Sequence, residues 1–210
     1  MPDLKLSPRK LNDLQYACLQ NALRLHFDSV LLAKGRSFAS AFAISVIASE
    51  ELGKAFGIAE IIFQAGFDKG RLHAEDTKFV KALLSDHKLK QGWFVSSFLD
   101  IFGPKDVLRR YQTIQSAKNN AIYAGVRTGN HQIVRPFLVS ASKAKQQIRT
   151  VNNALMDSVE GTLNGTYCYE DVAQEVFRSR RLLNKLLRAA KTVRLNDLVH
   201  WGIRPRLRAG

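Results

Sequence analysis

Cysteine, proline and strand-like patterns are all scarce in this sequence. The two cysteines, Cys18 and Cys168, lie far apart and lack metal-ligand spacing, so we interpret them as reduced thiols. Only five prolines occur in 210 residues, and alternation of apolar and polar residues is rare. These features favour an all-helical fold over one that contains a sheet. The length suits one domain with a sizeable core.

The sequence also lacks a long uncharged segment. Its central apolar run, 38–48, is far shorter than the roughly 20 residues that a membrane-spanning helix needs. The first residues, MPDLKLSPRKLND, are too polar to be the apolar part of a signal peptide. We therefore expect a cytoplasmic protein without a transmembrane segment.

Acidic residues are few compared with basic ones. The chain has 32 Lys and Arg against 18 Asp and Glu, a net charge of +14. Residues 178–210 hold ten basic residues and one acidic residue, so +9 of that excess lies there. We expect a polyanion partner, with nucleic acid first and an anionic membrane surface second; a merely solvated face is the alternative. The expected nucleic-acid contacts are Arg127, Arg178, Arg180, Arg181, Lys185 and Arg188.

The stretch 37–65, SFASAFAISVIASEELGKAFGIAEIIFQA, is expected to form the central helix of the fold. Ser37 is suited to the N-cap, and Gly66 is suited to a left-handed C-cap. No charged residue occurs between 38 and 48. A helix that is apolar on every side is typical of a buried central helix.

Three charged residues, Glu50, Glu51 and Lys54, interrupt this apolar helix. Glu50 and Lys54 are one turn apart on one face, whereas Glu51 points about 100° away. A buried carboxylate is costly unless it is paired or hydrogen-bonded. Two interpretations are open: a solvated intrahelical ion pair, or a polar centre that positions other helices.

Five further helices are expected, which gives an antiparallel bundle of about six. Caps, glycine–proline breaks and apolar spacing place the others at 8–34, 77–102, 105–124, 139–163 and 170–192. Asp76 is predicted to be the N-cap of the third helix, and the last helix is amphipathic with a basic side. We expect a single domain over 1–210, with a core bundle over about 7–135 and a helical pair with a basic tail over about 136–210.

His87 and Lys90 lie on the third expected helix, in the segment DHKLK. His87 is interpreted either as a hydrogen-bonded core histidine or as a partner of Glu50 and Glu51. Two glutamates and one histidine could also suggest a di-metal bundle. Such sites use paired Glu-x-x-His motifs, which neither SEELGKA nor DHKLK contains. No metal and no other cofactor is therefore predicted.

The end of the fourth expected helix and the turn after it, SAKNNAIYAGVRTGNH, gather the chemically most useful side chains. They are Lys118, Asn119, Tyr123, Arg127 and His131. Together they offer a cation for a phosphate, a fixed amide, and a base or a group that activates a nucleophile. Capping and solvent-facing roles are the alternative for all five.

Three of these segments, ASEELGKA, DHKLK and KNNAIYAG, resemble the AbiV-type abortive-infection proteins of the HEPN superfamily, which are small helical bundles. The matching residues are Glu50-Glu51-Leu52-Gly53-Lys54, then His87 with Lys90, then Lys118 with Tyr123. The resemblance covers about 21–127. The EELGK string together with the downstream H-x-x-K is what makes it specific.

The resemblance implies a prokaryotic antiphage or toxin-like protein that acts on RNA or translation, as a homodimer. HEPN proteins are often metal-independent ribonucleases with an Arg-x(4–6)-His element at a dimer interface. There the histidine is the general acid or base for the ribose 2′-OH, and the arginine stabilises the phosphorane charge. The resemblance places the catalytic residues at Lys118, Asn119 and Tyr123. It makes the polar support behind them Glu50, Glu51, Lys54, His87 and Lys90.

This sequence departs from the family pattern because Tyr123 stands where the histidine is expected. A tyrosine stays protonated near neutral pH and is a poor base. A literal Arg-x(5)-His occurs at Arg194 and His200, outside the resemblance, and is the second choice for the site. The alternative function is a non-catalytic module that blocks translation by binding RNA, a ribosomal component, a phage-encoded protein or a cognate antitoxin.

Overall fold

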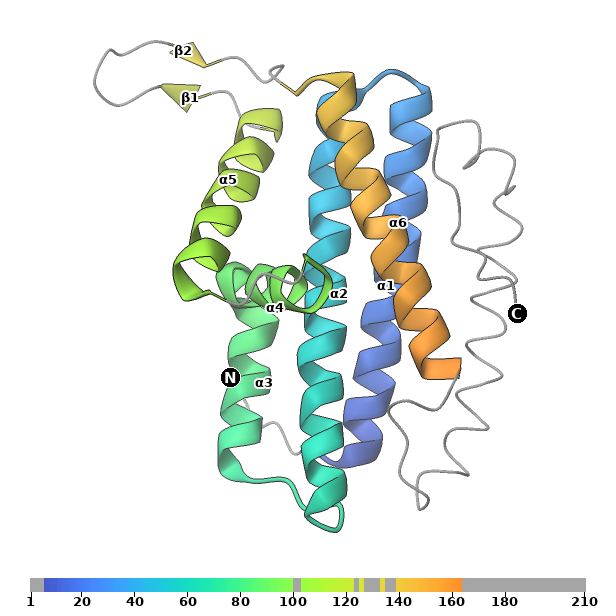
Figure 1. Cartoon of the computed structure of the whole chain (residues 1–210), viewed down its shortest axis with the longest axis vertical. Coiled ribbons are helices and arrows are strands. Elements are labelled where there is room, and N and C mark those ends of the chain that lie inside the picture. Colours follow the sequence, from blue (N-terminus) through green and yellow to red (C-terminus); the bar gives the residue numbers. More distant parts are fainter. Residues whose placement is uncertain (1–5, 100–102, 123–124, 127–132, 135–138, 164–210) are drawn as a thin grey trace.

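A computed structural model of the protein describes residues 6–99, 103–122, 125–126, 133–134 and 139–163. This part of the chain contains six α-helices and one short antiparallel ribbon (Figure 1). The helices are α1 (Pro8–Lys34), α2 (Phe38–Phe67), α3 (Ala74–Ser85), α4 (His87–Leu99), α5 (Pro104–Ile122) and α6 (Ala141–Leu163). The ribbon pairs β1 (Gly125–Val126) with β2 (Ile133–Val134). The predicted helical bundle is confirmed; the expected basic helix over 170–192 lies outside the described residues.

The central position predicted for α2 is confirmed. This helix contacts each of the other five described helices. Figure 1 shows it in the middle of the bundle, with α1 and α6 on one side and α3, α4 and α5 on the other. Consecutive residues of its first half are buried, including Ala41, Phe42 and Ala43, because neighbours cover every side of the helix.

Helix α1 has a capped start and ends in a tight link to α2. Ser7 is the N-cap of α1, where its Oγ accepts a hydrogen bond from the backbone N–H of Lys10 at 3.3 Å, and Pro8 follows as the first helical residue. At the other end, Arg36 adopts a left-handed backbone conformation (φ 62°) that turns the chain back. The two long helices therefore pack side by side.

The helix expected over 77–102 is in fact two helices, which corrects the prediction. The chain leaves the helical conformation at Asp86 (φ −90°, ψ 111°). Its Oδ1 accepts a hydrogen bond from the backbone N–H of Lys88 at 2.8 Å, so Asp86 acts as the cap of α4. The apolar pattern continues across this break, and so it gave no sign of a change in direction.

Two predicted caps are also wrong. Helix α3 begins at Ala74, and Asp76 lies in its first turn, where the carboxylate accepts a hydrogen bond from the backbone N–H of His73 at 2.7 Å. Gly66 lies inside α2, which continues to Phe67. Two left-handed residues, Lys69 (φ 49°) and Gly70 (φ 76°), reverse the chain, and the Gly70 N–H donates to the Ala65 carbonyl at 2.8 Å.

The largest core cluster joins α2 to α1, α3, α4 and α6. Its fully buried members include Leu11 of α1, Leu52 and Ile58 of α2, Leu83 of α3 and Val151 of α6. A second cluster packs the first half of α2 against α5 and the start of α6. Among the described helices, none is both long and apolar enough to cross a membrane.

Candidate functional site

The charged residues of α2 form a polar centre inside the bundle. Glu50 is only 3% exposed, and both oxygens of its carboxylate accept hydrogen bonds. Oε1 accepts from Lys118 Nζ of α5 at 2.8 Å and from Gln91 Nε2 of α4 at 2.9 Å, while Oε2 lies 2.6 Å from His87 Nδ1 of α4. Gln91 Nε2 also lies 3.4 Å from Gln115 Oε1 of α5. We call Glu50, His87, Gln91 and Lys118 the Glu50 network; it ties three helices together.

Gly53 makes this approach of α4 to α2 possible. A Cβ atom added at Gly53 would lie 1.9 Å from the backbone oxygen of Lys90. Only a glycine therefore fits at this crossing, because the obstacle is backbone and cannot rotate away. The close crossing brings the first turn of α4 to the level of Glu50, so that both His87 and Gln91 reach its carboxylate.

The Glu50 network holds a charge in the interior. Burial alone would raise the pKa of Glu50, but the hydrogen bonds from Lys118 and His87 and the charge of Lys118 hold that pKa below its ordinary value. Glu50 is therefore ionised at neutral pH, and its partner Lys118 is 7% exposed. Such a pair is stable only because each charged group has partners, and removal of one partner leaves a buried charge unpaired.

His87 is the one member of the network that reaches solvent: its side chain is 57% exposed. Because an ionised carboxylate only accepts hydrogen bonds, Nδ1 of His87 carries the hydrogen that it shares with Glu50. A neutral imidazole then has its lone pair on Nε2. Among the described residues Nε2 has no hydrogen-bond partner. Glu50 thus orients an exposed imidazole whose free nitrogen can accept a proton.

The other charged residues that the sequence placed in this centre have different partners from those expected. Lys54 forms an ion pair with Glu51 at 2.5 Å, and not with Glu50 one turn away. Both side chains of this pair are mostly buried, at 14% and 13% exposed. Lys90 is also buried, and burial followed by the charge of Lys54 lowers its pKa. Of the two glutamates considered as partners of His87, the structure shows the contact with Glu50, while Glu51 pairs with Lys54.

A pocket of about 610 Å³ lies between α4 and α5, near the start of α4, and His87 itself is not one of its lining residues. The chain neighbours of His87, Asp86 and Lys88, line it, together with Trp93 and Tyr111 and several apolar residues. Burial, and next the charges of Asp86 and Glu50, raise the pKa of Tyr111, so this phenol is protonated at neutral pH. The pocket offers aromatic and apolar walls, with the exposed Lys88 at its edge.

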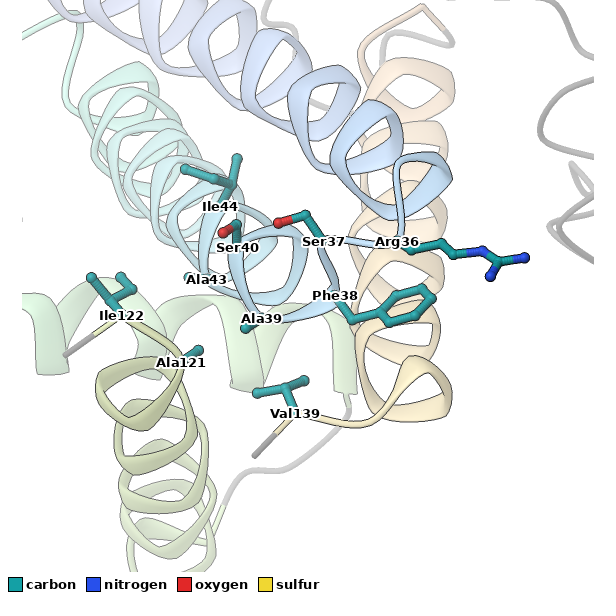
Figure 2. A pocket seen from close by; sticks show the side chains of 10 residues that line it. All are labelled: Arg36, Ser37, Phe38, Ala39, Ser40, Ala43, Ile44, Ala121, Ile122 and Val139. Atoms are coloured by element: carbon teal, nitrogen blue, oxygen red, sulfur yellow. The ribbon is translucent and has the colours of Figure 1, made fainter. Parts of the chain in front are cut away.

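The end of α5, where the sequence placed the catalytic residues, has a different character. Lys118 is buried in the Glu50 network, while Asn119 is exposed. The last turn lines a pocket of about 590 Å³ against the start of α2, through Ala121 and Ile122 (Figure 2). Apart from the hydroxyls of Ser37 and Ser40 and from Arg36, its lining is apolar, and Figure 2 shows the Arg36 guanidinium directed away from the other side chains. Among the described residues that line this pocket, none can act as a base.

Several residues named from the sequence lie outside the described part of the chain. They are Tyr123, Arg127, His131, Arg178, Arg180, Arg181, Lys185, Arg188, Arg194 and His200. The sequence did not assign Gln91 or Gln115 to the site. The one available signal was spacing, since Gln91 lies four residues after His87 and shares its helix face.

The described residues contain no group of three His, Cys, Asp or Glu side chains that could hold a metal ion. Glu50 and His87 do meet, but Glu51 pairs with Lys54. A metal centre built on these two glutamates and His87 therefore lacks its third ligand.

The arrangement of helices defines a class: an all-helical bundle with a buried ionic network across its central helix. The sequence model of the AbiV family, HEPN_AbiV, matches residues 10–156, which include all four members of the Glu50 network. The chain belongs to this AbiV family of HEPN proteins. No curated protein and no solved structure matches it. Family membership indicates an abortive-infection, HEPN-type function.

Proposed function

We propose that this protein acts on RNA during abortive infection, as a metal-independent ribonuclease in which His87 is the general base. The observation that carries the proposal is the contact between buried Glu50 and exposed His87 at 2.6 Å. A buried carboxylate that fixes one imidazole nitrogen leaves the other available for proton transfer. The membership of the AbiV family supports the antiphage context.

The proposed reaction is the transesterification of RNA. Nε2 of His87 accepts the proton of a ribose 2′-OH, and the 2′-oxygen attacks the adjacent phosphorus. The bond from phosphorus to the 5′-oxygen breaks, which leaves a 2′,3′-cyclic phosphate and a 5′-hydroxyl. Water supplies the proton to the 5′-oxygen, and the imidazolium returns its proton to the hydroxide.

The neighbouring groups are suited to hold the substrate. Lys88 is exposed beside His87 and can pair with the phosphate charge. Trp93 and Tyr111 line the adjacent pocket, where aromatic rings can stack on an unpaired base. Lys118 is a positioning residue in this proposal, because its ammonium pairs with Glu50 and not with a phosphate.

A cleavage assay on total cellular RNA and tRNA in EDTA tests this proposal. His87→Ala is expected to abolish cleavage, whereas His73→Ala is the matched control. His73 is another exposed histidine held by a carboxylate, at 2.7 Å from Asp68, but it lies at the start of α3. Asn119→Ala and His200→Ala test the two sites favoured by the sequence.

The outcomes of this assay separate the sites. Loss of cleavage in Asn119→Ala or His200→Ala, with His87→Ala active, would move the active site to the end of α5 or to the tail. Equal loss in His73→Ala would show that the effect of His87→Ala is not specific to the Glu50 network.

A second function, non-catalytic binding of RNA, is favoured by the net charge of +14 and by the tyrosine at the family's histidine position. In that case the purified wild-type protein retains RNA at low salt and releases it at high salt, because phosphate contacts displace counterions. It leaves every RNA intact. Charge reversal at Arg180, Arg181 and Arg188 would then weaken the retention of RNA. Retention that is unchanged both by salt and by these substitutions would contradict this function.

A further inference from the structure

A small pocket lies between α5 and α6, on a different face of α5 from Tyr111 and Gln115. Its volume is about 60 Å³, far below the about 590 and 610 Å³ of the other two pockets. A single water needs only roughly 10–15 Å³ of such space, so the pocket admits a group of several heavy atoms. Its buried lining residues are Phe42 of α2, Ile114 of α5 and Gln147 of α6, and Arg110 of α5 and Lys143 of α6 also line it.

Two buried nitrogen donors in this pocket have no hydrogen-bond partner among the described residues. They are Nε of Arg110 and Nε2 of Gln147, and the Gln147 residue is only 6% exposed. Buried donors in folded proteins are nearly always hydrogen-bonded, and an unpaired one calls for an explanation such as a bound ion. Both donors line the same pocket, one from α5 and one from α6, so a single acceptor group between the helices could satisfy them together.

The positive charge of the pocket favours an acceptor group that is negatively charged. Arg110 and Lys143 are its two charged lining residues, and no carboxylate lines it. Within the described chain neither cation forms an ion pair with a carboxylate. Lys143 Nζ lies 5.7 Å from the centroid of the Phe42 ring, which holds the ammonium close to the pocket. A water molecule would satisfy the donors but would leave both charges unbalanced.

We propose that this pocket binds a phosphate group, with Arg110, Gln147 and Lys143 as its ligands. A guanidinium and an amide N–H₂ suit the oxygens of a tetrahedral phosphate, and charge-assisted hydrogen bonds are the stronger kind. The phosphate can belong to an RNA backbone, to a nucleotide or to free inorganic phosphate. The site is separate from His87, so it does not depend on whether the protein cleaves RNA.

Isothermal titration at low salt tests the site with three probes: inorganic phosphate, adenosine monophosphate and a short single-stranded RNA. Arg110→Gln is expected to weaken binding of at least one probe by at least about tenfold, as expected for loss of a hydrogen bond to a charged group. Arg109→Gln is the matched control, because Arg109 is the exposed neighbour that pairs with Asp106 at 2.8 Å. The control for Lys143→Gln is Arg149→Gln, because Arg149 is exposed on the same helix, α6.

Gln147→Glu provides an independent check. Its carboxylate would lie beside Arg110 and Lys143 and occupy the place of the ligand, so saturable binding should disappear while the helical circular dichroism is unchanged. Binding of inorganic phosphate alone would identify a free-phosphate site, and binding of RNA alone would identify a backbone contact. The proposal is overturned if no probe binds saturably, or if Arg109→Gln weakens binding as much as Arg110→Gln does.

Discussion

Glu50 and His26 are both buried polar side chains, at 3% and 1% exposed, yet their charges differ. Glu50, between α2, α4 and α5, has three donors around it and remains ionised. His26, in α1, has no hydrogen bond at either ring nitrogen in the described part of the chain. Burial lowers its pKa to about 4, although Asn152 of α6 acts in the opposite sense. Hydrogen-bonding and charged partners, and not the degree of burial, therefore decide which of these two side chains keeps its charge.

The largest effect is expected from removing the centre of the network. Glu50→Ala should lower the free energy of unfolding by about 3–5 kcal/mol, because it leaves the Lys118 ammonium buried without its counter-charge. Glu51→Ala should cost less, since its partner Lys54 is nearer to solvent. Urea denaturation of the two variants measures the difference. Equal losses would show that Glu50 is not the centre.

His26 should make the protein sensitive to mild acid. Its folded pKa of about 4 lies below the ordinary 6.5, so between these values the unfolded chain binds the proton and the folded one does not. Stability is therefore full above pH 6.5 and falls as the pH drops toward 4, by about 3 kcal/mol. The contribution of Glu50 behaves differently, because its lowered pKa keeps that stability until the pH falls below the ordinary 4.5.

Unfolding measured across this pH range with wild type and His26→Leu checks the assignment. The variant should lose the slope between pH 6.5 and 4 and keep the steeper decline at lower pH. A slope that persists in His26→Leu would assign it to another group.

A smaller effect is expected at the helix crossing. Gly53→Ala should cost about 1–3 kcal/mol, because the added Cβ meets the Lys90 backbone and pushes α4 away from Glu50. Gly57→Ala is the control: its Cβ would meet the Leu83 side chain at 2.7 Å, which can rotate. Thermal unfolding of both variants compares them. An equal or larger loss in Gly57→Ala would show that the Lys90 backbone is not the harder of the two obstacles.

The smallest effect on stability is expected for His87→Ala. The histidine is largely exposed, and Glu50 keeps Gln91 and Lys118, so the loss should be about 0.5–1 kcal/mol. The same variant should lose RNA cleavage. A loss of several kcal/mol in denaturation would instead assign His87 a mainly structural role.

The sequence predicted the extent or the position of a helix where one cap or one apolar pattern determined it. The extent of α1 was predicted from its caps, and the central position of α2 was predicted from a stretch that is apolar on every side. The break at Asp86 was missed, although aspartate is a common N-cap, because the apolar spacing on either side still matched one helix.

The contacts of the candidate site could be foreseen only in part. Glu50, His87 and Lys118 were all singled out from the sequence, and the structure brings these three side chains together. Which glutamate meets His87 depends on the rotation of α2 against α4, and helical spacing alone also allowed Glu50 to pair with Lys54. The backbone contact at Gly53 sets that rotation, and a contact between helices distant in sequence is not visible in a local pattern.

The short link between α1 and α2 has a consequence for the order of folding. Residues 35–37 bring these two helices together with a small loss of chain entropy, whereas the bond from Glu50 to Lys118 closes a loop of 68 residues. We expect the α1–α2 pair to form early and α5 to dock late. Native-state hydrogen exchange should then show the amides of α5 opening at lower free energy than those of α1 and α2. The polar centre would therefore be assembled last and released first.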